Sequence, residues 1–128
     1  MDSNSDSGRL WVGLGALIGL GAVGMAAAAS HALAGRLDAG GLAAVRSAVD
    51  IQAWHALALL FLGLWIPRGG ILAHAAGACF AAGVILFCTG VYASALGGVR
   101  LPSVAPAGGL ILMLGWALLA ASTLVSRR

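Results

Sequence analysis

Long uncharged stretches dominate the chain, and a few charged residues separate them. No charged residue occurs in residues 10–35, 51–67, 69–99 and 101–126. An apolar stretch of about 20 residues is long enough for a helix to cross the hydrocarbon core of a bilayer. The pattern therefore predicts an all-α membrane protein, in which four antiparallel transmembrane helices form one small bundle. The predicted spans cover residues 10–32, 48–66, 71–95 and 104–125.

The connections between the predicted spans contain residues that interrupt helices. Pro and Gly occur within residues 67–70 and again within residues 97–102, and both connections are too short for anything but antiparallel neighbours. The first connection is longer. It holds Leu42, Val45 and Val49 at helical spacing, which predicts a weakly amphipathic run at the membrane interface that leads into the second span.

The two ends of the chain bear on domain organisation and orientation. Residues 1–9 are predicted to form a disordered polar tail ahead of a four-helix domain of residues 10–128. Small residues at 27–29 make a cleaved signal peptide an alternative for the first segment, although only Arg9 precedes it as a positive charge. With four spans the termini share one side, and the arginines divide four to three in favour of that side. The positive-inside tendency then predicts cytoplasmic termini.

Composition narrows the class of protein further. The chain has 128 residues, of which 61% are hydrophobic and 9% are charged, and it contains neither Lys nor Glu. In soluble domains about a quarter of all residues are charged, so an ordinary soluble domain is excluded. The basic residues are a few Arg at the ends of spans, and they do not form the clustered basic surface that nucleic-acid binding requires. No carboxylate lies deep in a span, and this argues against proton- or sodium-coupled transport.

Small residues on the spans predict close helix contacts. Helices in lipid associate largely through tight packing over Gly, Ala and Ser, because no hydrophobic force drives them together. The predicted helix-packing positions are Gly15, Gly19, Gly77, Gly108 and Gly109. Such positions serve contacts inside the bundle or contacts with a neighbouring chain, and both uses stay open. Trp residues near span ends are interpreted as interfacial anchors or packing bulk.

Four polar residues are predicted to meet at one end of the bundle. His31 and His55 each lie five residues from a charge of the first connection, so both are expected about 7 Å from it and at similar depth. Gln52 shares a helix face with His55, and Tyr92 approaches the same end from the third span. The candidate site is therefore the cluster of His31, Gln52, His55 and Tyr92.

The cluster has one favoured interpretation and two alternatives. A hydrogen-bonded network that fixes helix packing is favoured, while ligand or metal binding and proton transfer are the alternatives. No cofactor is predicted. If a metal, haem, copper or quinone-like ligand binds, His31 and His55 are the expected ligands. Cys79 and Cys88 lie nine residues apart on opposite faces of one helix, so no disulfide joins them. No catalytic motif occurs, and no enzyme activity is predicted.

Several segments resemble one known family. The residues that carry the resemblance are 47–60 (SAVDIQAWHALALL), 21–33 with its SHAL ending, 86–92 (LFCTGVY), 106–109 (PAGG), Gly115 and Trp116. They resemble the YgdD-like membrane proteins, domain-of-unknown-function family 423, whose relatives include mitochondrial transmembrane protein 256. The chain departs from the family pattern at Ala28, Ala29 and Cys88.

The resemblance implies a multi-pass protein of the bacterial inner membrane with about four spans, and it puts the four cluster residues on family motifs. It implies no activity. We therefore expect a structural or accessory subunit that lies in the lipid bilayer and packs against another membrane complex or against itself, with no nucleic-acid partner. The alternative is a binding or redox module that holds its ligand at His31 and His55.

Overall fold

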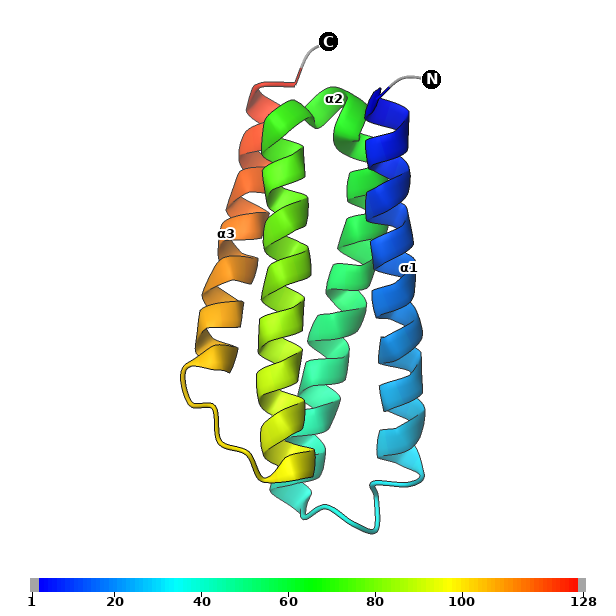
Figure 1. Ribbon diagram of the computed structural model, residues 1–128, viewed down its shortest axis with the longest axis vertical. Coiled ribbons are helices and arrows are strands. Elements are labelled where there is room, and N and C mark those ends of the chain that lie inside the picture. Colours follow the sequence, from blue (N-terminus) through cyan, green and yellow to red (C-terminus); the bar gives the residue numbers. More distant parts are fainter. Residues whose placement is uncertain (1–2, 127–128) are drawn as a thin grey trace.

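The computed structural model describes residues 3–126, which form three long helices (Figure 1). These are α1 (Ser3–Ser30), α2 (Ala39–Gly97) and α3 (Val104–Leu124). All three are long and apolar enough to cross a membrane, so the all-α prediction is confirmed. The 59-residue α2 contains the predicted second and third spans. It folds back on itself, and we refer to residues 39–69 as its first arm and to residues 71–97 as its second arm.

The reversal of α2 takes place at Gly70. This residue has φ 57° and ψ −143°, which is not helical, and Pro67 lies just before it. Only glycine adopts such a conformation readily, because it has no Cβ. Figure 1 shows the two arms running antiparallel and side by side. The helix interruption predicted within residues 67–70 is therefore the turn between the arms.

The other end of α2 is closed by a left-handed glycine. Gly98 has φ 64°, and the N–H of Val99 donates to the carbonyl of Ala93 at 3.1 Å. This bond satisfies a carbonyl that the ending helix would leave without a partner. α3 then begins at Val104, at the predicted position.

α2 begins ahead of the predicted second span. The helix starts at Ala39, because Asp38 caps it: its carboxylate accepts a hydrogen bond from the N–H of Gly41 at 2.7 Å. The start of the membrane span at residue 48 stays a prediction. The run predicted to lie at the interface is thus the first part of α2. Val45 and Ala48, both in this part, are fully buried.

The N-terminal tail also differs from the prediction. α1 begins at Ser3, so residues 3–9 are helical, and Asp6 in the first turn suits the positive end of the helix dipole. Gly8 packs against Gly63 of the first arm, since a Cβ on Gly8 would lie 2.6 Å from the Gly63 carbonyl oxygen. The predicted disorder of residues 3–9 is therefore wrong, whereas the start of the membrane-spanning domain at residue 10 stays a prediction. The rest of the predicted tail, residues 1 and 2, lies outside the described residues.

The outer helices α1 and α3 pack on opposite sides of α2. α1 meets the first arm along Gly15 and the second arm at His74, whereas α3 meets the second arm along Gly108 and the first arm at Trp65. Within residues 3–126, no Cα atom of α1 lies within 8 Å of a Cα atom of α3. The bundle is consequently elongated in cross-section, and the start of α1 and the end of α3 lie at the same end (Figure 1).

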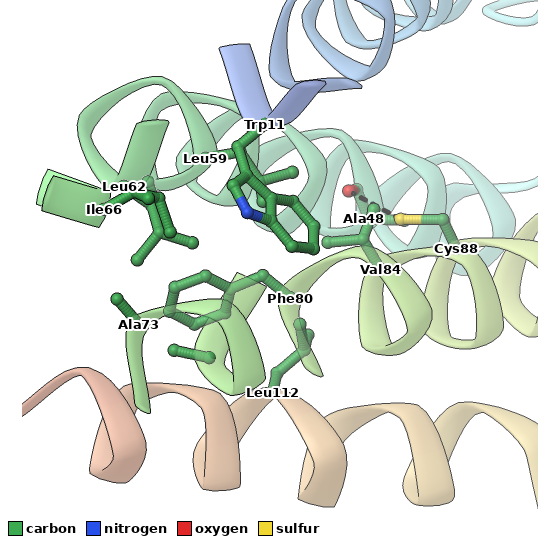
Figure 2. Packing of buried hydrophobic residues seen from close by; sticks show 12 residues of the cluster. Trp11, Ala48, Leu59, Leu62, Ile66, Ala73, Phe80, Val84, Cys88 and Leu112 are labelled. Atoms are coloured by element: carbon green, nitrogen blue, oxygen red, sulfur yellow. Dashed lines mark hydrogen bonds between the residues drawn. The ribbon is translucent and has the colours of Figure 1, made fainter. Parts of the chain in front are cut away.

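The core lies between the two arms of α2. Figure 2 shows Phe80 of the second arm among Leu59, Leu62 and Ile66 of the first arm, all with almost no exposed surface. Side chains from the outer helices complete the core, including Trp11 from α1 and Leu112 from α3. The outward faces of the helices carry large exposed apolar side chains, as expected of surfaces that face lipid.

Candidate functional site

His55 lies in the bundle interior on the first arm of α2, where it is 4% exposed. The Trp116 indole N–H donates to its Nε2 at 3.0 Å. Because Nε2 accepts this bond, Nδ1 carries the ring proton, and it lies 2.6 Å from the carbonyl oxygen of Ile51. The ring also meets Phe80 edge-on at a centroid distance of 5.4 Å. Both imidazole nitrogens are therefore engaged within the protein.

A second set of hydrogen bonds joins three helical segments. The Tyr92 hydroxyl on the second arm donates to Oε1 of Gln52 on the first arm at 2.8 Å. The Gln52 side-chain amide in turn donates to the carbonyl oxygen of Ile18 in α1 at 3.0 Å. These hydrogen bonds connect α1 to both arms of α2. They also give partners to the Gln52 side-chain amide, which would be costly to bury unpaired in an apolar interior.

The structure brings together only part of the predicted cluster. Gln52 and Tyr92 are hydrogen-bonded, whereas His55 bonds to Trp116 and His31 is exposed in the turn that follows α1. Because α2 begins at Ala39, His55 lies sixteen residues into the helix, about 24 Å from its start at 1.5 Å per residue. The expectation that the two histidines share a depth is wrong.

These positions bear on the ligand alternative. His31 and His55 are separated along the bundle, and coordination through Nε2 of His55 would require the Trp116 bond to break. Within residues 3–126 no group of three or more His, Cys, Asp or Glu side chains is placed to hold a metal ion. The arrangement therefore does not favour a metal or haem site at these two histidines.

Two further indole hydrogen bonds were not anticipated from the sequence. Trp11 of α1 donates to Nδ1 of His74 on the second arm at 3.2 Å. Trp65 of the first arm donates to the hydroxyl of Ser122 in α3 at 3.0 Å, and that hydroxyl donates to the Leu119 carbonyl at 2.6 Å. With Trp116, three tryptophans interpreted as anchors or bulk serve as donors between helices. The signal in the sequence is that the apolar spans contain few other side-chain donors.

Glycines make the close helix contacts that these bonds need. A Cβ on Gly15 would lie 2.8 Å from a backbone carbonyl of the first arm, one on Gly77 would lie 2.6 Å from the Leu62 side chain, and one on Gly108 would lie 2.5 Å from a backbone nitrogen of the second arm. Gly19 and Gly109 have ordinary contacts, at 3.6 and 3.9 Å. All five predicted packing glycines thus face other helices of the same chain.

One face of α1 is open instead. A Cβ on Gly13 or Gly24 would meet nothing within 4 Å. Leu17 and Leu20 lie between them on the same face, and they are 66% and 70% exposed. This outward face of α1, defined by Gly13, Leu17, Leu20 and Gly24, combines small and apolar residues. A helix of another chain could approach it closely.

The fold and its internal bonds define a class of protein. Long apolar helices expose apolar side chains outward and pair their polar side chains inward, which is the arrangement that a bilayer requires. The chain is a multi-pass membrane protein. Residues 25–109 match the family described as protein of unknown function (DUF423), and the chain belongs to that family.

Relatives extend the match over nearly the whole chain. It is 34% identical over 116 residues to a UPF0382 membrane protein of Staphylococcus haemolyticus, which covers 90% of this chain and 95% of the relative. A UPF0382 membrane protein of Staphylococcus aureus is 33% identical over 116 residues, with the same coverage. The resemblance found in the sequence is thus confirmed, and these names specify no activity. No solved structure matches the chain.

Proposed function

We propose that the protein is a structural or accessory component of the bacterial plasma membrane, which packs against another membrane complex or a second copy of itself and catalyses no reaction. In this proposal α1, the two arms of α2, and α3 each cross the bilayer once. The length of the arms supports four crossings, because residues 39–69 and 71–97 each exceed the roughly 20 residues that a span needs.

One observation carries the proposal: the polar side chains inside the bundle are bonded to one another or to backbone carbonyls. Among the described residues, no buried side-chain nitrogen or oxygen lacks a hydrogen-bond partner. A ligand site usually presents a few polar groups that its ligand completes. A bundle whose interior polar groups are already paired supports a role in which a rigid shape matters.

The proposed orientation has cytoplasmic termini. It is supported by the position of the start of α1 and the end of α3 at one end of the bundle (Figure 1). Arg9 and Arg68 lie at that end, and the sequence adds two C-terminal arginines that lie outside the described residues. The opposite end carries Arg36, Arg46 and Arg100. The names of bacterial membrane-protein relatives support the location in a bacterial membrane.

The outward face of α1 is the proposed contact for the partner. Its open glycines would let a partner helix approach closely, as small residues do in membrane helix pairs. The glycines that face inward already serve the bundle itself. A bulky residue at Gly24 would block a partner without disturbing the bundle, because nothing lies within 4 Å of its position.

The test is purification of the full chain from its native membrane in mild detergent. Co-purifying proteins are quantified by mass spectrometry, the oligomeric state is measured by light scattering, and the visible absorption spectrum is recorded. Gly24→Leu on α1 is compared with Ala117→Leu, a matched substitution on the exposed surface of α3. We expect a stoichiometric partner or dimer that Gly24→Leu loses and Ala117→Leu keeps, together with a featureless visible spectrum.

Three results would contradict the proposal or a part of it. A Soret band or stoichiometric copper in the purified protein would replace the accessory role with a binding or redox role. A monomer without stoichiometric protein partners would exclude the accessory role itself. Retention of the partner by Gly24→Leu would exclude the outward face of α1 as the contact.

A further inference from the structure

A groove opens at the end of the bundle that lies opposite the start of α1. It has a volume of about 730 Å³ and lies between the beginning of the first arm of α2, the end of the second arm, and the connection that leads into α3. This volume is within the range of small-molecule sites, roughly 300–1,000 Å³. The walls are small or apolar residues, among them Ala44, Gly90, Val91 and Ala105.

The groove also carries one positive and one negative side chain. Arg100, in the connection before α3, is exposed and has no ion-pair partner in the part of the chain that the structure describes. Asp38, at the start of α2, accepts a hydrogen bond from the N–H of Gly41 at 2.7 Å. Ser94 of the second arm adds a hydroxyl. A ligand that fits this lining has an anionic group, a cationic hydrogen-bond donor and an apolar part.

The depth of the groove matches a lipid that stands in the bilayer. Gly90 lies seven residues before the end of α2, so the groove runs about 10 Å along the second arm. The polar layer of a bilayer is about 5–7 Å thick on each side of its hydrocarbon core. In the arrangement of four crossings proposed above, on which this depth rests, the charged residues of the groove lie level with lipid headgroups, and the apolar walls reach the first carbons of the acyl chains.

We propose that this groove binds a phospholipid with an ethanolamine headgroup. Its phosphate contacts the Arg100 guanidinium, its ammonium donates to the Asp38 carboxylate, and the start of an acyl chain lies along Val91 and the small residues of the wall. Charge-assisted hydrogen bonds of this kind are the strong ones. Both charged side chains of the groove have a partner of opposite charge only when the headgroup supplies a phosphate and an ammonium group.

Other lipid headgroups complement the lining less well. A glycerol headgroup supplies the phosphate but no positive charge for Asp38, so the carboxylate would lie near an uncompensated anion. A choline headgroup supplies both charges, but its trimethylammonium has no N–H to donate to a carboxylate. The structure therefore assigns selectivity for ethanolamine over choline to Asp38, and affinity for any phosphate to Arg100.

The test is lipid binding to the purified full chain in detergent, measured by native mass spectrometry. Phosphatidylethanolamine, phosphatidylglycerol and phosphatidylcholine with matched acyl chains are added in equal amounts. We expect phosphatidylethanolamine to be the preferred adduct. Arg100→Gln should lower binding of all three lipids about tenfold, and Asp38→Asn should lower phosphatidylethanolamine about tenfold while phosphatidylglycerol rises. Asn keeps the helix cap, because its side-chain oxygen accepts the same hydrogen bond.

Matched controls separate the groove from general charge effects. Arg46→Gln and Asp50→Asn remove exposed charges of the first arm that do not line the groove, and lipid binding should stay at the wild-type level. The melting temperature of each variant without added lipid checks that it folds. Phosphatidylethanolamine should raise the melting temperature of wild type and controls, and at the same lipid concentration should raise that of Arg100→Gln less.

Several outcomes would overturn the assignment. Equal binding of the three lipids, or binding that neither Arg100→Gln nor Asp38→Asn changes, would show that the groove does not recognise the headgroup. A preference for phosphatidylglycerol in the wild type would contradict the role of Asp38. Free phosphoethanolamine is added as a competitor at the lipid concentration. Complete displacement would mean that a soluble phosphate compound, not a lipid, is the ligand.

Discussion

The hydrogen bond from Trp116 to His55 joins α3 to the first arm of α2 and can be tested by a double-mutant cycle. Trp116→Phe keeps an aromatic ring against Phe80 and removes the indole donor. It leaves Nε2 of His55 without a partner, in a residue that is 4% exposed. We expect Trp116→Phe to lower the free energy of unfolding.

The expected loss of unfolding free energy is bounded by the cost of a buried acceptor without a donor and by the strength of interhelical hydrogen bonds in membranes. A buried acceptor without a donor costs about 1–3 kcal/mol, and interhelical hydrogen bonds in membranes contribute about 0.6 kcal/mol on average and about 1.7 kcal/mol at most. Trp116 is 46% exposed, so lipid or detergent fills part of the space that the smaller ring leaves. The loss for Trp116→Phe should be about 1–2 kcal/mol. In a His55→Leu background the same substitution should cost much less, which gives a coupling energy of about 0.6–1.7 kcal/mol.

The assay is equilibrium unfolding by sodium dodecyl sulfate in mixed micelles, followed by far-ultraviolet circular dichroism so that loss of an indole does not change the signal. Trp54→Phe is the matched control, because Trp54 precedes His55 directly and is 60% exposed. It should change the unfolding free energy by less than about 0.5 kcal/mol. A coupling energy near zero between Trp116 and His55, with both single variants folded, would refute the inference that this bond stabilises the bundle.

Three further predictions concern packing and the turn. Gly108→Ala should destabilise the bundle by about 1–3 kcal/mol, because its Cβ would lie 2.5 Å from a backbone nitrogen of the second arm, whereas Gly13→Ala in open space should be neutral or stabilising; the same unfolding assay compares them. Gly70→Ala should cost about 1–3 kcal/mol from its φ of 57°, measured as a lower unfolding midpoint. Tyr92→Phe should cost about 0.5–1.5 kcal/mol and increase hydrogen exchange in α1, because its bond orients Gln52.

Much of the fold could be predicted from the positions of charged and helix-breaking residues. The uncharged stretches located the helical segments, and the Gly and Pro clusters located the turn at Gly70 and the end of α2 at Gly98. Hydropathy does not locate the start of α2, because the start depends on the cap that the Asp38 side chain provides. Composition does not locate the start of α1 either, because residues 3–9 are mostly polar and pack through a glycine contact with the first arm.

The hydrogen-bond partners of the candidate site could be predicted only where the position of a residue along the bundle axis is enough to identify its partner. Gln52 and Tyr92 were expected at the same end of the bundle, and they are hydrogen-bonded. For His55 the rotation of the helix about its axis decides the partner, and this rotation turns the ring toward α3 and Trp116. Spacing along one helix does not contain that information, since it depends on how neighbouring helices pack.

The glycine content and the indole hydrogen bonds have a common physical basis. Trp11 reaches His74 by lying across Gly77, where a Cβ would come within 2.9 Å of the indole ring. Trp65 lies over Gly69 in the same way on its path to Ser122. An indole is large, and the absence of a side chain at Gly77 and at Gly69 leaves room for it between the closely packed helices. The same lack of side chains brings the helix backbones together, which shortens the distance that each donor must span. For Trp11 and Trp65, glycines and tryptophans thus determine jointly which polar groups meet, and neither residue type predicts these two pairings alone.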